Sequence, residues 1–225
     1  MHIKTSVPII AIDGPSGSGK GTVAAQVATR LGWYYLDSGS LYRLTALAAS
    51  VQNIGFEEED KVANIAKNLD VRFEGQSILL AGEEVTEKIR TEAVGEGASV
   101  VSKLPSVRQA LLQRQRDFAF GLGLVADGRD MGSEVFPEAG LKVYLTASVA
   151  ERANRRYKQL LSKGMNPDYN DIFDGIAKRD ERDMNRSLAP LIQTHDARLL
   201  DTTNCSVEEA VQKVLDWWKE VNIRA

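Results

Sequence analysis

The chain has 225 residues, with 28 Lys and Arg against 31 Asp and Glu, which gives a net charge of −3. This length allows one large buried core with an insertion. A slightly negative chain has no bulk attraction for nucleic acid polymers or anionic membranes, so neither is an expected partner. The one cysteine, Cys205, excludes an intrachain disulfide and a multi-cysteine metal site and is typical of a reducing compartment. We therefore expect a cytoplasmic protein whose ligands are small molecules.

The first predicted element is a strand over residues 7–12, and a glycine-rich loop separates it from a helix. The helix is indicated by apolar residues at helical spacing: Val23, Ala24, Val27, Ala28 and Leu31. The loop consists of Gly14, Pro15, Ser16, Gly17, Ser18, Gly19, Lys20, Gly21 and Thr22. Glycines let backbone N–H groups turn toward a phosphate chain, the helix N-terminus adds a positive dipole end, and Lys20 adds a point charge. This order predicts a P-loop that binds a nucleoside triphosphate; a plain glycine turn is the alternative.

Gly21 is the one departure from the usual loop, because it stands where a Walker loop has Ser or Thr. The hydroxyl of that residue normally binds Mg²⁺. We expect this ligand to be displaced to Thr22 or replaced by water. Lys20 keeps its usual place, so we expect it to act beside the transferred phosphate.

A second candidate site follows the short apolar run that ends in Asp37. A helix is expected directly after it, with Tyr42 and Arg43 at its start. An arginine there can bind a second phosphate across a cleft from Lys20. The alternative is an arginine on a solvated helix face.

Residues 53–104 interrupt the alternation of strands and helices and predict an inserted subdomain. The acidic run 57–60 is typical of the first turn of a helix. The apolar residues of that helix are Val62, Ile65, Ala66 and Leu69. Residues 71–73 and 77–80 indicate a β-hairpin around residues 74–76.

A third candidate site begins at Asp127, which follows the apolar run 124–126. An acidic residue at the carboxyl end of a buried strand lies where open α/β sheets bind ligands, and it can orient waters around magnesium. Arg129 and Asp130 follow it and are expected to face the same cleft. A self-paired surface turn is the alternative.

The remaining apolar runs complete the predicted fold. Candidate buried strands lie at residues 7–12, 124–126, 141–145 and 199–200. Helices separate them, and the last helix is expected to begin at Ser206, whose spacing from Glu209 fits a capping box. The alternation predicts an α/β fold of the P-loop type, with a parallel sheet flanked by helices.

Two arginine-rich helices are expected between these last strands. The first begins at Ser148, whose spacing from Glu151 again fits a capping box, and it carries Arg152, Arg155 and Arg156. Positive charges this close repel each other unless an anion is present. This helix therefore predicts an anion clamp, with a solvated charged face as the alternative.

The second of these helices carries Arg179, Asp183 and Arg186 at spacings that place them on one face. Its other charges, among them Asp180, are expected to point elsewhere. Residues 163–167, between the two helices, have the composition of a hinge or a lid tip. A solvated charged face is again the alternative.

Several stretches together form a more specific pattern than the P-loop alone. They are Ile12-Asp13-Gly14-Pro15-Ser16-Gly17, Gly19-Lys20-Gly21-Thr22, Leu36-Asp37-Ser38-Gly39, Tyr42-Arg43, Ile89-Arg90-Thr91, Ala126-Asp127-Gly128-Arg129-Asp130-Met131-Gly132, Glu151-Arg152-Ala153 with Arg155-Arg156, and Arg179-Asp180 through Arg182-Asp183 to Asn185-Arg186. The chain resembles the bacterial cytidylate kinases, within the nucleoside monophosphate kinase family, over essentially its whole length. These stretches carry the resemblance. Gly21 fits this resemblance, because the loop of that family resembles Gly-Lys-Gly-Thr.

The resemblance implies a P-loop core at residues 1–52 and 105–225, an inserted subdomain at 53–104 that binds the nucleoside monophosphate, and a short lid at about 155–167. It implies that ATP binds on the loop from Gly14 to Thr22. The residues implied in catalysis are Lys20, Arg152, Arg155, Arg156 and Asp127. Those implied at Mg²⁺, directly or through water, are Thr22, Asp37 and Asp127. Those implied at the acceptor nucleotide are Asp37, Tyr42, Arg43, Ser99, Arg108, Arg129, Asp130, Arg179, Asp183 and Arg186.

The implied reaction is transfer of the ATP γ-phosphoryl group to CMP or dCMP by a monomeric enzyme. Among the implied acceptor residues, Arg43 and Arg129 hold the phosphate and Asp130 belongs to the set that reads cytosine. A carboxylate accepts a hydrogen bond from the 4-amino group of cytosine, whereas uracil would turn an oxygen acceptor toward it. Two alternatives stay open: another acceptor, such as UMP, AMP or a small alcohol, and a nucleotide-dependent switch or binding module.

Overall fold

The computed structural model describes residues 7–74 and 77–224. They belong to two compact units, one formed by residues 1–36 and 118–225 and the other by residues 37–117. Two residues of the expected hairpin turn, Gly75 and Gln76, lie outside the described residues. No helix in the described ranges combines the length and the apolar composition that crossing a membrane requires.

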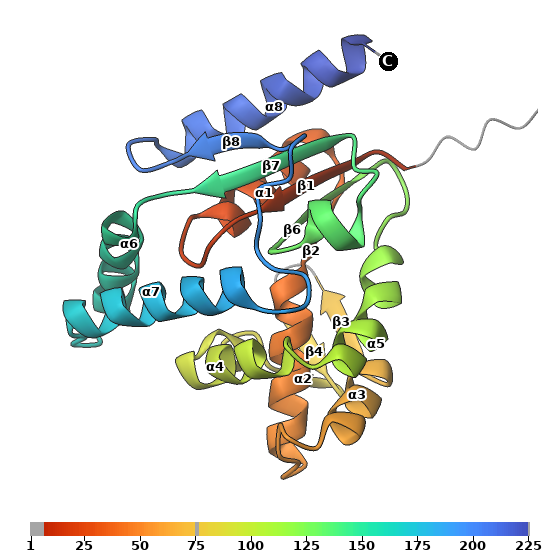
Figure 1. Cartoon of the computed structure of the whole chain (residues 1–225), viewed down its shortest axis with the longest axis vertical. Coiled ribbons are helices and arrows are strands. Elements are labelled where there is room, and N and C mark those ends of the chain that lie inside the picture. Colours follow the sequence, from red (N-terminus) through yellow and green to blue (C-terminus); the bar gives the residue numbers. More distant parts are fainter. Residues whose placement is uncertain (1–6, 75–76, 225) are drawn as a thin grey trace, which may run out of the picture. The chain divides into compact units, whose positions relative to one another are not determined.

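The first unit is built on a five-stranded sheet with the strand order β2-β6-β1-β7-β8 (Figure 1). Its strands are β1 (Ile9–Asp13), β2 (Tyr34–Asp37), β6 (Leu124–Gly128), β7 (Leu141–Thr146) and β8 (Arg198–Asp201). β1 pairs in parallel with β6 and β7, and β7 pairs in parallel with β8. A parallel strand is covered on both faces, which is why these segments read as continuous apolar runs. The predicted α/β fold with a parallel sheet is confirmed.

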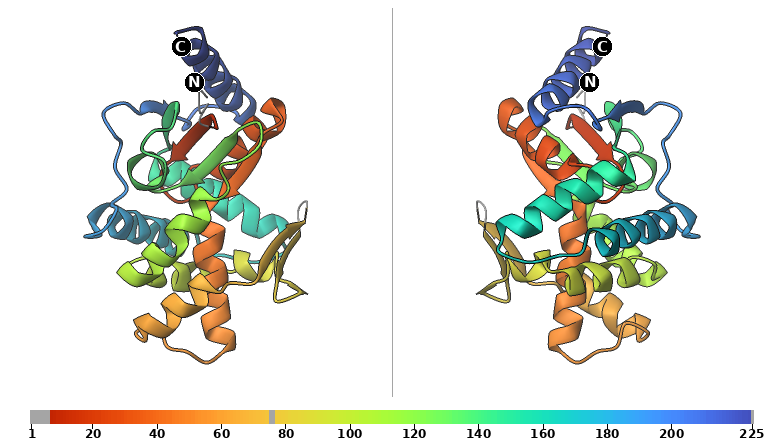
Figure 2. Two further views of the ribbon diagram at one scale, coloured as in Figure 1. Left: turned by 90° about the vertical axis from the view of Figure 1, so that its right-hand side faces the viewer. Right: turned by 90° about the vertical axis from the view of Figure 1, so that its left-hand side faces the viewer.

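Helices cover this sheet and extend from its strand ends. They are α1 (Lys20–Leu31), α6 (Val149–Ser162), α7 (Tyr169–Asn185) and α8 (Val207–Arg224), with a short π-helical turn at Met131–Val135. α1 and α8 pack against each other and share one side of the sheet (Figure 2). The core between them and the sheet contains Ile10, Ile12, Val23, Val27, Val125, Val143, Leu145, Val211, Val214 and Trp218. Ser206 and Glu209 form the predicted capping box, because each side chain accepts the backbone N–H of the other.

The loop at residues 163–168 joins α6 to α7. The two helices pack together, and the rings of Tyr157 and Tyr169 meet edge to face with their centroids 6.1 Å apart. Gly164 has a φ of 75°, in the left-handed region that favours glycine, which allows the chain to turn just after α6. Asp168 then caps α7 by accepting from the backbone N–H groups of Asn170 and Asp171.

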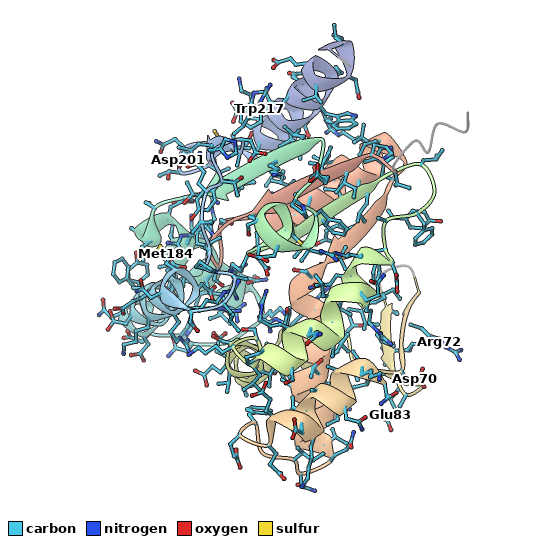
Figure 3. All side chains as sticks on the ribbon, turned by 45° about the vertical axis from the view of Figure 1, so that its right-hand side comes forward. Asp70, Arg72, Glu83, Met184, Asp201 and Trp217 are labelled. Atoms are coloured by element: carbon cyan, nitrogen blue, oxygen red, sulfur yellow. The ribbon has the colours of Figure 1, made fainter. Side chains whose placement is uncertain are left out.

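In its described residues, the second unit contains four helices and a small antiparallel sheet with the strand order β3-β4-β5. These elements are α2 (Ser38–Val51), α3 (Glu59–Lys67), β3 (Val71–Glu74), β4 (Ser77–Leu80), β5 (Glu83–Glu84), α4 (Glu92–Val101) and α5 (Pro105–Arg116), with a short 3₁₀ turn at Lys88–Arg90. The predicted helix after the acidic run is confirmed, and so are the two strands of the hairpin. Arg72 and Glu83 lie on exposed positions of the small sheet (Figure 3).

This unit covers more of the sequence than the predicted insertion at residues 53–104. It also includes α2, which packs on α3 and α4, and α5, which packs on α3. Leu41 and Leu44 of α2 and Val107 and Leu111 of α5 are fully buried. A helix belongs to the unit in which its apolar face is covered, so the unit extends from residue 37 to residue 117.

Candidate active site

The P-loop connects β1 to α1, and three of its glycines are required by the backbone. A β-carbon at Gly14 would lie 1.9 Å from the carbonyl oxygen of Leu145 on β7, so only glycine fits there. Gly17 and Gly19 have φ values of 73° and 90°, in the left-handed region. Gly19 is the N-cap of α1, which begins at Lys20. The loop therefore leads into the N-terminus of a long helix, where the backbone dipole favours an anion.

Lys20 lies across the loop that it follows. Its ammonium group donates to the carbonyl oxygen of Pro15 at 3.4 Å, and the residue is half-buried. The positive charge is therefore held over the loop instead of extending into solvent. Together with the start of α1, this arrangement is suited to binding a chain of phosphates.

Arg152 of α6 is buried behind the P-loop and holds it in place. Its guanidinium donates to the carbonyl oxygens of Ala147 and Ser16, both at 2.9 Å. It also forms an ion pair of 2.5 Å with Asp180 of α7, and only 4% and 9% of these two side chains are exposed. Asp180 was expected to point away from the helix face that carries Arg179, Asp183 and Arg186, and this is confirmed, because its carboxylate is the counter-ion of the buried Arg152.

Arg155, one turn further along α6, is also engaged by the protein. It donates to the carbonyl oxygen of Ser18 in the P-loop at 3.1 Å and to the carbonyl oxygen of Thr202 at 2.5 Å. Its third partner is the carboxylate of Glu151, at 2.9 Å. Arg156 donates to the side chain of Gln159 at 2.8 Å. Arg152 and Arg155 therefore each have a carboxylate partner within the chain, and the role of this helix as an anion clamp stays a prediction.

Asp127 ends the apolar part of β6 and lies beside the start of α1. Its Oδ1 accepts a hydrogen bond of 2.8 Å from the hydroxyl of Tyr35 on β2, and the residue is 4% exposed. Its Oδ2 would lie 3.8 Å from a β-carbon placed at Gly21. Thr22, in the same turn of α1, is exposed.

These groups fit a magnesium ion that accompanies a phosphate chain, because Mg²⁺ prefers one or two carboxylates together with phosphate oxygens and water. Asp127 supplies such a carboxylate next to the P-loop. Within the described ranges, no group of three or more His, Cys, Asp and Glu side chains could hold a metal ion. A single carboxylate beside the P-loop is suited to an Mg²⁺ ion whose other ligands are phosphate oxygens and water.

Arg129 follows the carboxyl end of β6 and pairs with α7. Its Nε donates to Oδ2 of Asp183 at 2.7 Å, with 16% and 10% of the two side chains exposed. Burial by itself would raise the pKa of Asp183, but the guanidinium of Arg129, with those of Arg179 and Arg186 nearby, holds it below the ordinary value. Asp183 is therefore an anionic centre among three arginines.

Asp130 and Arg186 form a second pair beside the first. Their charged groups are 3.8 Å apart, and only 5% and 6% of the side chains are exposed. Arg186 is the first residue after α7, and its Nε donates to the carbonyl oxygen of Ala189 at 2.5 Å. The structure thus brings five predicted acceptor residues into one cluster: Arg129, Asp130, Arg179, Asp183 and Arg186.

Asp13 is a residue of this region whose role the sequence reasoning missed. It ends β1, is 7% exposed, and its two oxygens accept from the backbone N–H groups of Met131 and Gly132 at 2.8 and 2.7 Å. Burial raises its pKa to about 6, against the lowering effect of these two hydrogen bonds. A polar residue at the end of an otherwise apolar strand was the available signal, but its partners lie more than a hundred residues away in the sequence.

In the second unit, Arg43 of α2 is held against the start of α4. It donates to the carbonyl oxygens of Ile89 and Thr91 at 2.6 and 3.4 Å. A β-carbon at Gly95 would lie 3.0 Å from its guanidinium, so glycine makes room for it. Asp37 caps α2 by accepting from the backbone N–H of Ser40 at 3.2 Å. This capping role was missed, and a role of Asp37 at Mg²⁺ stays a prediction.

The other predicted acceptor residues of this unit also lie on neighbouring helices. The guanidinium carbon of Arg108 on α5 is 5.9 Å from the ring centre of Tyr42 on α2, and Nη1 of Arg108 donates to the carbonyl oxygen of Ser102 at 3.3 Å. Ser99 of α4 is 5% exposed, and its hydroxyl is buried without a hydrogen bond to the described residues. A buried hydroxyl of this kind can donate to a ligand.

The chain is similar in sequence to known proteins over most of its length. The sequence profile of the cytidylate kinase family matches residues 10–220. The chain is 57% identical to a cytidylate kinase of Neisseria meningitidis serogroup C over 95% of its length and 98% of that protein. It is 55% identical to a cytidylate kinase of Chromobacterium violaceum over 96% of its length and 97% of that protein, and 54% identical to one of Pseudomonas paraeruginosa over 95% and 96%. With a P-loop of this geometry and a match of this extent, the chain belongs to the cytidylate kinase family.

Proposed function

We propose that the protein is a cytoplasmic monomer that transfers the γ-phosphoryl group of ATP to CMP or dCMP, giving ADP and CDP or dCDP. Besides the family match, the register of β1 and β6 supports this proposal. β1 and β6 are adjacent parallel strands, with Asp13 opposite Gly128, so the P-loop and the turn that holds Arg129 and Asp130 leave the same edge of the sheet. Open α/β sheets bind their ligands at this edge. The P-loop and the arginine cluster lie together there, which supports a reaction between two nucleotides.

The donor half consists of the loop from Gly14 to Thr22, with Lys20 over the phosphates. We assign Arg155 and Arg156 to neutralisation of the charge that spreads over the phosphoryl oxygens in the transition state. Arg152 is the buried ion-pair partner of Asp180 and donates to the loop, so we assign it to holding the loop in shape. The stretch at 155–167 is the proposed lid, whose closure would keep water away from ATP.

We assign to the acceptor nucleotide the cluster around Asp183 and, in the second unit, three arginine and serine side chains named below. Arg43 and Arg129 are assigned to the phosphate of CMP, and Arg179 and Asp183 to the sugar. The residues assigned to cytosine are Ser99, Arg108, Asp130 and Arg186. Asp130 has the chemistry for discrimination, because its carboxylate accepts from the 4-amino group of cytosine and faces an oxygen acceptor in uracil.

The reaction needs no general base. The acceptor is a phosphate whose second pKa is about 6, so at neutral pH its attacking oxygen is already mostly ionised. The protein has to align the two nucleotides and to stabilise the transferred charge. We assign this stabilisation to the fixed positive charges of Lys20, Arg155 and Arg156. We propose that Asp127 and Thr22, with Asp37, hold Mg²⁺ through water; when bound, the ion neutralises phosphate charge.

The experiment that tests the proposal is an ADP-release panel with ATP, Mg²⁺ and each of CMP, dCMP, UMP, AMP, GMP and dTMP. We expect fast turnover with CMP and dCMP and at least about tenfold lower kcat/KM with UMP. Fast turnover with UMP or AMP instead would replace the assigned acceptor. Slow ATP hydrolysis that no acceptor accelerates would refute the kinase assignment and favour a nucleotide-dependent binding module.

A further inference from the structure

The hydroxyl of Tyr35 lies beside Gly21 of the P-loop. Most Walker loops place a Ser or Thr hydroxyl after the lysine, whereas this chain has Gly21 there. A β-carbon at Gly21 would meet the hydroxyl oxygen of Tyr35 at 3.4 Å and Oδ2 of Asp127 at 3.8 Å. The space beside residue 21 is therefore occupied by a hydroxyl, but one that comes from β2 and not from the loop.

The hydroxyl of Tyr35 is aimed at the carboxylate of Asp127. It donates to Oδ1 at 2.8 Å, and Asp127 is 4% exposed. A hydrogen bond to a buried carboxylate restricts the rotation of that carboxylate about its χ2 bond, which is otherwise a soft torsion. With Oδ1 engaged in this way, Oδ2 is the oxygen directed toward the first turn of α1.

The ring of Tyr35 is itself fixed by the sheet. Tyr35 lies on β2, which is a neighbour of β6 in the sheet, and its ring packs against the core cluster that contains Val23 and Val125. The adjacent Tyr34 is 47% exposed, and its ring contacts that of Phe120, with the centroids 4.0 Å apart and the ring planes tilted by 41°. Successive side chains of a strand point to opposite faces, so only Tyr35 can reach Asp127.

We propose that Tyr35 is a positioning residue that orients Asp127 for Mg²⁺·ATP, in place of the hydroxyl that the P-loop lacks at residue 21. The inference rests on the proposed kinase function and on the role of Asp127 near the metal. It assigns to Tyr35 no contact with the reacting phosphoryl group. Its effect is therefore on the affinity for ATP in the presence of Mg²⁺ and not on the affinity for ATP alone.

The test compares ATP binding to Tyr35→Phe and to the unaltered protein by titration calorimetry, once with excess Mg²⁺ and once with EDTA. Phenylalanine keeps the ring in the core, so only the hydroxyl is removed. We expect the affinity for Mg²⁺·ATP to fall about tenfold, as for loss of a hydrogen bond to a charged group, while the affinity in EDTA stays within about twofold. Tyr34→Phe removes a hydroxyl from the opposite face of the same strand and is the matched control, expected to have no effect in either condition.

Asp127→Asn completes a double-mutant cycle. If Tyr35 acts through Asp127, Tyr35→Phe should have no further effect on Mg²⁺·ATP affinity when Asp127 is already replaced.

Equal losses of ATP affinity in Mg²⁺ and in EDTA would overturn the inference, because they would indicate a general packing role of Tyr35. An unchanged affinity in Tyr35→Phe would overturn it as well. If the unaltered protein binds ATP equally with and without Mg²⁺ yet phosphorylates CMP, this inference fails and the kinase proposal stands; if it does not phosphorylate CMP, the proposed function itself fails.

Discussion

Replacement of Asp13 by asparagine should change the pH dependence of stability in a predictable direction. Burial raises the pKa of Asp13 from the ordinary 3.8 to about 6, with the negative charge of Asp130 adding to the effect and Lys20 opposing it. The folded protein therefore binds the Asp13 proton more tightly than the unfolded chain does. The stability that this proton contributes is fully present below about pH 4 and is lost as the pH rises through about 6. At about 1.4 kcal/mol per pKa unit, the loss is roughly 3 kcal/mol.

Asp13→Asn has no proton to lose and serves as the reference. It carries a separate penalty that does not depend on pH, because a carboxamide has one acceptor oxygen for the two backbone N–H groups that Asp13 accepts at 2.8 and 2.7 Å. Leaving a buried donor unpaired costs about 1 to 3 kcal/mol. The difference in unfolding free energy between the unaltered protein and Asp13→Asn should therefore decrease by roughly 2 to 3 kcal/mol from about pH 4 to about pH 7.

Urea unfolding followed by tryptophan fluorescence measures this difference in unfolding free energy for the unit that contains Asp13. All 3 tryptophans, Trp33, Trp217 and Trp218, lie in the unit that contains Asp13. Other carboxylates titrate in both proteins, so their contributions cancel in the difference. A difference that stays constant within about 1 kcal/mol over this pH range would refute a raised pKa for Asp13. Because Asp13 holds the turn after Asp130, we also expect Asp13→Asn to raise the KM for CMP more than the KM for ATP.

Three further substitutions test the assigned roles. Lys20→Ala should lower kcat by about a thousandfold, because it removes a fixed charge from the transferred phosphoryl group, with a smaller change in CMP affinity; near-normal turnover would exclude that role. Asp130→Ala should narrow the ratio of kcat/KM for CMP over UMP by about tenfold or more, and an unchanged ratio would remove Asp130 from base discrimination. Arg152→Ala should lower the free energy of unfolding by about 3 to 5 kcal/mol, because it leaves the carboxylate of Asp180 buried and unpaired. Arg156→Ala on the same helix is the control for thermal unfolding, and equal Tm values for the two variants would contradict the structural role of Arg152.

Much of the fold follows from local patterns in the sequence. The apolar runs at 124–126 and 141–145 are buried parallel strands, and the glycine loop between β1 and α1 has the left-handed backbone that glycine permits. Ser206 and Glu209 form a capping box because their partners are only three residues apart. Such features depend on interactions between residues close in sequence, so the sequence is sufficient to predict them.

The extent of the second unit could not be predicted in the same way. α2 and α5 are amphipathic helices, and their composition does not say which neighbour covers the apolar face. Contacts with α3 and α4 decide that both belong to the unit at residues 37–117. Long-range packing of this kind has no local signature, which is why the predicted boundaries at 53 and 104 fell inside the unit.

The arginine helices show most clearly what each level determines. The sequence by itself placed Arg152 and Arg155 beside a P-loop, and helical spacing put Arg179 and Asp183 on one face, but spacing does not identify the partner of a charge. The tertiary structure paired Arg152 with Asp180 and brought the hydroxyl of Tyr35 to Asp127, across long separations in the chain. The physical reason is that burial makes an unpaired charge costly, so the partner is chosen by which elements pack together. The sequence was therefore sufficient to predict a phosphate-binding loop. Only the packing decided which side chains hold that loop and Asp127 in place.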